Sequence, residues 1–148
     1  MTRPPHILLV ESLYYTHIAA ELRRGAERAL AAVGATHERI AVRGAFEIPA
    51  AIGIAGRTSQ RFDGFVALGC VIRGETTHYD HICAESARGL QDLAIRDGLA
   101  IGYGILTVEN EAQALARASP DGRDKGGEAV RACLAIVDLK QRFARNGR

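Results

Sequence analysis

The sequence predicts a single α/β domain in which a four-stranded parallel sheet carries helices on both faces. The chain has 148 residues, which is the length of one domain with a sizeable core. Short apolar runs alternate with segments of helical periodicity, and this order is typical of parallel strands joined by right-handed helical crossovers. One run, residues 64–72 (GFVALGCVI), is apolar throughout, as expected for a central strand that is covered on both faces.

The first half of the chain begins with a strand, a helix and a second strand. Residues 6–10 (HILLV) and 37–42 (HERIAV) have the apolar and β-branched character of strands. Between them, apolar residues recur at helical spacing over 16–33. Thr16 is the expected N-cap of this helix, and Gly34 stands where a C-terminal glycine cap belongs.

Proline and glycine mark several of the later boundaries. Pro49 is tolerated only near a helix start, so a helix is expected from about Glu47 or Ile48. The elements expected after it are a strand at 64–72, a helix at 79–96 ended by Gly98, a strand at 100–108, a helix at 110–118 and a final helix at 128–143. Gly102 and Gly104 predict that another backbone or a ligand approaches the last strand closely.

The segments outside these elements are short. Residues 119–127 (SPDGRDKGG) are expected to form a turn-rich break, and residues 1–5 a flexible N-terminal tail. No linker, repeat or low-complexity stretch divides residues 1–148, so one domain is expected.

Composition excludes several functional classes. The net charge of +2 does not indicate a general nucleic-acid binder. No apolar run approaches the roughly 20 residues of a membrane helix, and residues 7–10 are too short for a signal peptide. The three cysteines, Cys70, Cys83 and Cys133, are odd in number and form no CxxC pair, which predicts reduced thiols in a cytoplasmic protein.

Ligands of such a sheet bind beyond the carboxyl ends of the strands. The loops to inspect are therefore 11–15, 43–47, 72–78 and 107–110. Three of these loops carry side chains that could bind a ligand or take part in catalysis, and this holds before any likeness to known proteins is considered.

The turn after the central strand is the richest of these loops. Gly74-Glu75-Thr76-Thr77 joins a strand to a helix N-terminus, where free N–H groups and hydroxyls favour an anion such as phosphate. A simple helix cap by a threonine explains the same residues. His78, just beyond, is a candidate general acid/base or a surface histidine. His78-x-x-His81 also allows a metal site, but this spacing is weak evidence, and no metal is expected.

Other candidates are scattered along the chain. Glu47 can accept hydrogen bonds from ligand hydroxyls, or it can simply favour the positive end of a helix dipole. Tyr14 can stack on a planar heterocycle or cover the core. Arg117 and Lys125 flank the turn-rich break and form a basic pair of the kind a phosphorylated substrate needs.

Four blocks of the sequence resemble the lumazine synthase family. They are GAFEIP (44–49), GCVIRGETTHYDHICAES (69–86), GILTVENEAQA (104–114) and RASPDGRDKGGEA (117–129), and with their spacing they span nearly the whole chain. The resemblance implies a flavodoxin-like fold, pentamers, active sites between adjacent subunits, and no metal or redox cofactor. It implies condensation of 5-amino-6-(D-ribitylamino)uracil with 3,4-dihydroxy-2-butanone 4-phosphate to 6,7-dimethyl-8-ribityllumazine, phosphate and water, the penultimate step of riboflavin biosynthesis.

The resemblance also assigns roles to the residues that bind the pyrimidine substrate. Tyr14 matches the aromatic residue that stacks on the pyrimidine ring. Ala45 and Glu47 match the ribityl-binding pair, with Glu47 accepting from the hydroxyls. Val71 and Ile72 match the strand end whose backbone reads the uracil edge.

The phosphate and proton-transfer roles fall on a second set. Glu75 and Thr76 match the phosphate turn, where the Glu75 side chain must point away because the amide makes the contact. Arg117 matches the phosphate-binding arginine and His78 the proton-transfer residue. The residues expected from the neighbouring subunit are Tyr103 and Lys125.

Two alternatives to the synthase stay open at this point. One is a relative that binds lumazine or flavin without turnover, and the presence of His78, Arg117 and Lys125 favours catalysis over it. The other is a hydrolase on the same fold, which does not explain Tyr14 with Glu47. The segment 119–127 carries a proline and acidic residues where shell-forming relatives have small and basic ones, so a pentamer, or at most a pair of pentamers, is expected.

Overall fold

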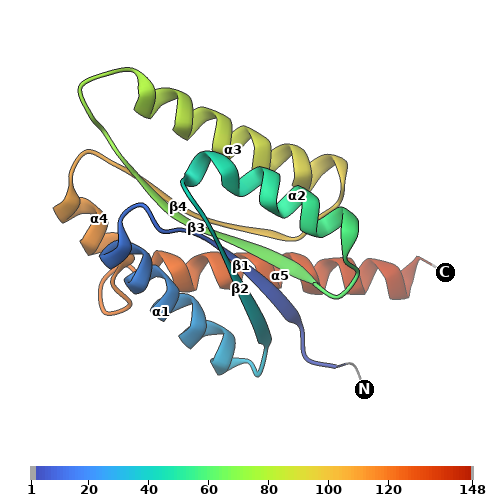
Figure 1. Cartoon of the computed structure of the whole chain (residues 1–148). Coiled ribbons are helices and arrows are strands. Elements are labelled where there is room, and N and C mark those ends of the chain that lie inside the picture. Colours follow the sequence, from blue (N-terminus) through green and yellow to red (C-terminus); the bar gives the residue numbers. More distant parts are fainter. Residues whose placement is uncertain (1–2, 148) are drawn as a thin grey trace.

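A computed structural model describes residues 3–147 of the chain (Figure 1). The four strands form one sheet in the order β2-β1-β3-β4, and every neighbouring pair is parallel. This confirms the predicted α/β class. The elements in chain order are β1 (His6–Ser12), α1 (Thr16–Ala32), β2 (Thr36–Val42), a short 3-10 helix η1 (Ala45–Glu47), α2 (Ile48–Thr58), β3 (Gly64–Ile72), α3 (His78–Arg96), β4 (Ile101–Val108), α4 (Glu111–Ala118) and α5 (Lys125–Asn146).

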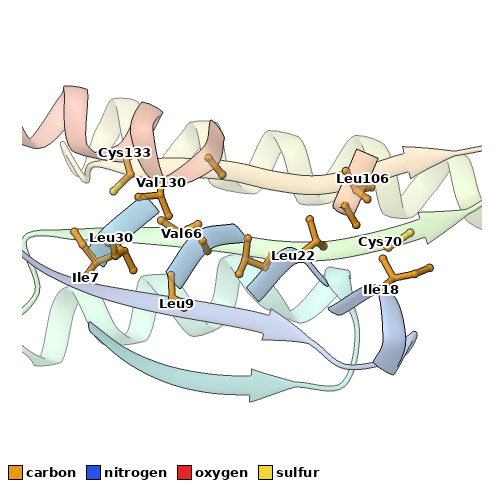
Figure 2. Close-up of a cluster of buried hydrophobic side chains, with 14 of the residues drawn as sticks. Ile7, Leu9, Ile18, Leu22, Leu30, Val66, Cys70, Leu106, Val130 and Cys133 are labelled. Carbon is orange, nitrogen blue, oxygen red and sulfur yellow. The ribbon is translucent and has the colours of Figure 1, made fainter. Parts of the chain in front are cut away.

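Helices cover both faces of the sheet, as the sequence predicted. Figure 1 shows α2 and α3 on one face and α1, α4 and α5 on the other. Alternate residues of β1 pack against the helices on opposite faces of the sheet, because successive side chains of a strand point to opposite faces. Ile7 and Leu9 belong to the apolar cluster under α1 and α5 (Figure 2), whereas Leu8 and Val10 belong to the cluster under α2 and α3. Burial on both faces explains why the central strands are apolar without alternation.

Gly102 marks the point where helix α5 comes closest to the sheet. A Cβ added at Gly102 would overlap the carbonyl oxygen of Ala129 in α5, and one added at Gly104 would lie 2.8 Å from the carbonyl oxygen of Ala67 in β3. The close approach predicted at both glycines is therefore confirmed, and the approaching groups are backbone.

Replacing Gly102 with alanine is expected to destabilise the fold strongly. Overpacking a core costs about 1–3 kcal/mol, and the upper end applies here because a helix backbone cannot move aside as a side chain can. Urea unfolding followed by circular dichroism measures the loss. Gly74→Ala is the matched control, because an added Cβ there meets nothing within 4 Å. Equal stability of the two variants would contradict this account of the packing.

The starts of two helices differ from the sequence-based expectations, whereas the predicted glycine cap is confirmed. Helix α5 begins at Lys125, three residues before the predicted residue 128, because Asp124 caps it by accepting a hydrogen bond from the Gly127 N–H. Helix α1 has Tyr15 and not Thr16 as its N-cap, with no side-chain cap bond. Gly34, with φ of 72°, follows the end of α1, and its N–H donates to Ala31, as the capping prediction required.

Part of the segment predicted to be a flexible tail contacts the domain. Arg3 donates to Asp63 at 2.7 Å, and the Pro5 carbonyl accepts from the Thr36 N–H at 2.9 Å. Residues 1 and 2 lie outside the described residues.

Candidate active site

Eight of the predicted site residues lie in or beside the loops at the carboxyl ends of β1, β2 and β3, and we call them the strand-end group. They are Tyr14, Ala45, Glu47, Val71, Ile72, Glu75, Thr76 and His78. Parallel strands end at the same edge of a sheet, so these loops share one edge. The sequence prediction of a ligand site at this edge rests on that arrangement.

Tyr14 presents an open aromatic surface at this edge. Its side chain is 75% exposed, and its ring meets the ring of Tyr15 edge-on, with centroids 4.9 Å apart and planes at 78°. Tyr15 in turn packs against the core cluster. The edge-on contact orients the Tyr14 ring without covering its faces, which suits stacking on a flat heterocycle.

Glu47 is held in place by its own loop. Its Oε1 accepts a hydrogen bond from the Gly44 N–H at 3.0 Å, and Ala45 between them is buried. Glu47 is also the residue from which α2 departs, so the helix-dipole explanation offered by the sequence holds in part. A carboxylate has about four acceptor positions, so this one bond orients the group and leaves capacity for ligand hydroxyls.

The turn between β3 and α3 exposes its polar residues. Glu75, Thr76 and His78 are all exposed, and α3 begins at His78. Thr77 is the N-cap of α3 but makes no side-chain cap bond, and the Thr76 hydroxyl just before it accepts from the His78 N–H at 3.3 Å. The same turn points the N-terminus of a 19-residue helix at solvent, which favours an anion there.

Arg73 fastens this turn to its surroundings, a role that the sequence-based reasoning missed. Its guanidinium lies 4.4 Å from the centre of the Tyr79 ring, and its Nε donates to Glu109 at 2.8 Å. Its backbone N–H donates to the Val108 carbonyl. The signal available in the sequence was its place directly after the central strand. Arg73 thus ties the turn to the start of α3 and to the end of β4.

Val71 and Ile72 form the carboxyl end of β3. They pair in register with Thr107 and Val108 of β4. Val71 is buried and Ile72 is half-buried, so their side chains belong largely to the packing. A contact to a ligand at this strand end would therefore come from backbone groups, in keeping with the role that the resemblance implies.

The three remaining site residues meet in a groove beside the outer strand, which we call the β4 groove. The cavity measures about 490 Å³, and its lining includes Tyr103, Thr107, Arg117, Lys125, Glu128 and Ala132. The family resemblance implies that Arg117 binds phosphate. In the folded chain it shares the groove with Tyr103 and Lys125, and the lining includes no residue of the strand-end group.

The polar side chains of the β4 groove are oriented by local contacts. Arg117 donates from Nη1 to the Gln113 carbonyl at 3.1 Å, and Lys125 Nζ lies 2.8 Å from Glu128 Oε2. The Lys125 ammonium lowers the pKa of the Glu128 carboxyl. Burial raises the pKa of the Tyr103 hydroxyl, and the neighbouring Ser86 side chain of α3 partly offsets this rise. The two cations, Arg117 and Lys125, suit an anionic, oxygen-rich ligand.

A sequence profile of the 6,7-dimethyl-8-ribityllumazine synthase family matches residues 4–141. The chain belongs to this family. It is 55% identical to the 6,7-dimethyl-8-ribityllumazine synthase of Sphingopyxis alaskensis, over 93% of this chain and 96% of the relative. It is 53% identical to "6,7-dimethyl-8-ribityllumazine synthase 1" of Rhizobium meliloti, over 95% of each, and 49% identical to the synthase of Bartonella tribocorum, over 99% and 97%.

Membership of the lumazine synthase family gives the enzyme class. The chain is a transferase of riboflavin biosynthesis, and the family acts on small molecules and is oligomeric. A solved structure of a protein fragment from Peptoclostridium difficile 630 is similar in fold, with a TM-score of 0.52 over 89% of this chain and 98% of that one. At 9% identity this likeness concerns the fold alone.

Within residues 3–147, no three side chains of His, Cys, Asp or Glu gather where they could hold a metal ion. The described helices include none that is long and apolar enough to cross a membrane.

Proposed function

We propose that two neighbouring subunits build each active site, one supplying the strand-end group and the other the β4 groove. The reaction is that of the family: 5-amino-6-(D-ribitylamino)uracil condenses with 3,4-dihydroxy-2-butanone 4-phosphate to give 6,7-dimethyl-8-ribityllumazine, phosphate and water. The observation that carries the proposal is the meeting of Tyr103, Arg117 and Lys125 in one groove. These three residues lie apart from the strand-end group, with which they must act on the substrates.

The position of the groove supports a shared site. β4 is an outer strand of the sheet, so one side of it has no strand partner within the described chain. Such an edge is a natural place for another subunit to approach. A head-to-tail contact of this kind joins two different surfaces and generates a closed ring when the rotation closes. Five subunits is the number implied by the family resemblance.

The strand-end group binds the pyrimidine substrate in this proposal. Tyr14 stacks on the ring, with Tyr103 from the neighbour as a second aromatic wall. The oriented carboxylate of Glu47 accepts from the ribityl hydroxyls beside Ala45. Backbone groups at Val71 and Ile72 read the uracil edge.

The phosphorylated substrate lies between the two subunits. The amides around Glu75 and Thr76 face the phosphate at the positive end of α3, and Arg117 with Lys125 neutralises it from the neighbour. Developing charge on the leaving phosphate is then stabilised by donors that are already in place. The rest of the rate enhancement comes from holding both substrates together.

His78 moves the protons. Imine formation, loss of phosphate and ring closure each need a proton delivered or removed, and a neutral imidazole can do both in turn. His78 begins α3 with its side chain exposed beside the phosphate turn, which supports this role.

Purified protein mixed with both substrates tests the function directly. Formation of the lumazine is followed by its absorbance and fluorescence, and sustained turnover is expected. Tight binding of lumazine or flavin without turnover would instead identify a binding protein. The chain is proposed to work in the cytoplasm, which its three free cysteines support.

Arg117→Ala is expected to raise KM for the phosphorylated butanone far more than KM for the uracil substrate. A charge-assisted hydrogen bond is worth roughly 1.5–3 kcal/mol, which corresponds to about 10- to 150-fold in KM. Initial rates with each substrate varied in turn measure both constants. Arg61→Ala is the matched control, because it loses an arginine–carboxylate pair with Glu38 away from the groove. Equal effects on both substrates would assign Arg117 a structural role.

A further inference from the structure

Asp124 has a backbone conformation that side-chain-bearing residues rarely adopt. Its φ is 49° and its ψ is 52°, and among residues 3–147 it is the one non-glycine residue with positive φ. Asp and Asn tolerate this left-handed region better than other residues, but at some cost. Such a conformation persists only where its surroundings enforce it, and it is frequent at functional sites.

The Asp124 side chain is mostly buried and takes part in a hydrogen bond and in ion pairs. It is 16% exposed, and its Oδ1 accepts from the Gly127 N–H at 3.3 Å, which caps α5. Its Oδ2 lies 3.6 Å from Arg131 and 4.0 Å from Arg28. The carboxylate therefore connects the first turn of α5 with helix α1, which carries Arg28.

Glycines around Asp124 leave room for this arrangement. A Cβ at Gly25 of α1 or at Gly127 of α5 would overlap the Asp124 carboxylate, and a Cβ at Gly126 would overlap the Leu22 carbonyl oxygen. Helix α1 thus packs closely against the first turn of α5. The position of α5 along α1 is fixed by these contacts.

Asp124 also joins the two helices that carry the cations of the β4 groove. Its N–H donates to the Ser119 carbonyl at 3.0 Å, directly after α4, and its carbonyl accepts from the Glu128 N–H at 2.9 Å in α5. Arg117 stands two residues before Ser119, and Lys125 follows Asp124 directly. A shift of Asp124 would therefore change the position of one cation relative to the other.

We propose that Asp124 is a positioning residue that fixes the position of Lys125 relative to Arg117 in the β4 groove. This inference rests on the proposed role of Lys125 in the shared site. Asp124 does not touch the substrate. It acts by holding the left-handed turn and the first residues of α5 in the one arrangement that α1 accepts.

Three substitutions separate the two properties of Asp124. Asp124→Asn retains both the capping oxygen and the tolerance for positive φ, so its kcat/KM for the phosphorylated substrate is expected to stay close to that of the unmodified chain. Asp124→Gly retains only the backbone freedom. Asp124→Ala retains neither, and a fall of about 10- to 100-fold is expected, because small misplacements of binding groups have effects of this size. Asp124→Gly carries the comparison if Asp124→Ala fails to fold.

A double-mutant cycle with Lys125→Ala tests whether Asp124 acts through Lys125. In the Lys125→Ala background, Asp124→Ala is expected to have little further effect on kcat/KM. Asp63→Ala is the control, because Asp63 also accepts from a backbone N–H, that of His6, and from an arginine, Arg3, at the other end of the sheet. It is expected to lower the melting temperature and leave kcat/KM unchanged.

Other outcomes overturn the inference, and they distinguish it from the proposed function. If Lys125→Ala lowers activity but Asp124→Ala lowers only the melting temperature, Asp124 is merely structural. If the two effects multiply, Asp124 acts independently of Lys125. If Lys125→Ala itself leaves activity unchanged, the proposed role of the groove fails, and the positioning role fails with it.

Discussion

Dilution of the enzyme below its assembly constant is expected to abolish activity. In the proposed site, the strand-end group of one subunit acts with the β4 groove of its neighbour, so a single subunit would offer no complete site to a substrate. Specific activity measured over decreasing protein concentration, with sedimentation at each concentration, should show loss of activity together with loss of the ring. A fully active monomer would refute the shared site.

Mixed assemblies provide the control for this prediction. His78→Ala removes a group from one half of the site, and Lys125→Ala removes one from the other half. When the two variants are mixed and reassembled, some interfaces receive both changes and others receive neither, so activity should exceed that of either variant alone. Failure to recover any activity would mean that His78 and Lys125 serve the same subunit's site.

The same sedimentation runs report the size of the assembly. We expect a pentamer, or at most a pair of pentamers. The segment between α4 and α5 carries Pro120 and Asp121, where the family resemblance implies small and basic residues in shell-forming members. A closed shell of many pentamers would contradict this expectation.

His78→Ala is expected to lower kcat by about 100-fold with modest change in either KM, which is the lower end for general acid/base groups. The lower end applies because the variant still positions both substrates, and water can carry some of the protons. Steady-state rates with each substrate saturating measure the effect.

His81→Ala is the matched control for His78→Ala. His81 is also exposed and lies one turn along α3. It belongs to the metal alternative considered from the sequence, but not to the proposed mechanism. An unchanged kcat for His78→Ala would remove His78 from the mechanism.

The strands and most helices could be predicted because their signals are local. An apolar run such as 64–72 can satisfy its burial only in the middle of a sheet, and Gly34 and Gly98, both with positive φ, ended their helices as expected. The beginning of α5 was predicted wrongly because it depends on contacts that a local sequence pattern does not contain. Gly126 and Gly127 read as a break in isolation, but in the fold Asp124 caps α5 just before them and α1 packs closely against Gly126.

The grouping of the site residues depended on tertiary contacts that no local pattern contains. Arg117, Tyr103 and Lys125 come from α4, β4 and α5, and their common groove follows from how those elements pack. The resemblance named the residues, but it did not show that Arg117 shares a groove with Tyr103 and Lys125 in one subunit. Arg73 was missed because its contacts to Tyr79 and Glu109 form only in the fold.

The packing of α5 has a consequence for how the chain folds. Ile7 of the first strand shares its apolar cluster with Val130 and Cys133 of the last helix (Figure 2). A chain still emerging from the ribosome lacks these partners until synthesis is almost complete, and contacts between distant parts of a sequence form slowly. Until then, helices α1 and α4 cover this face of the nascent sheet only in part. A chain cut after α4 should be degraded by protease far faster than the full-length chain.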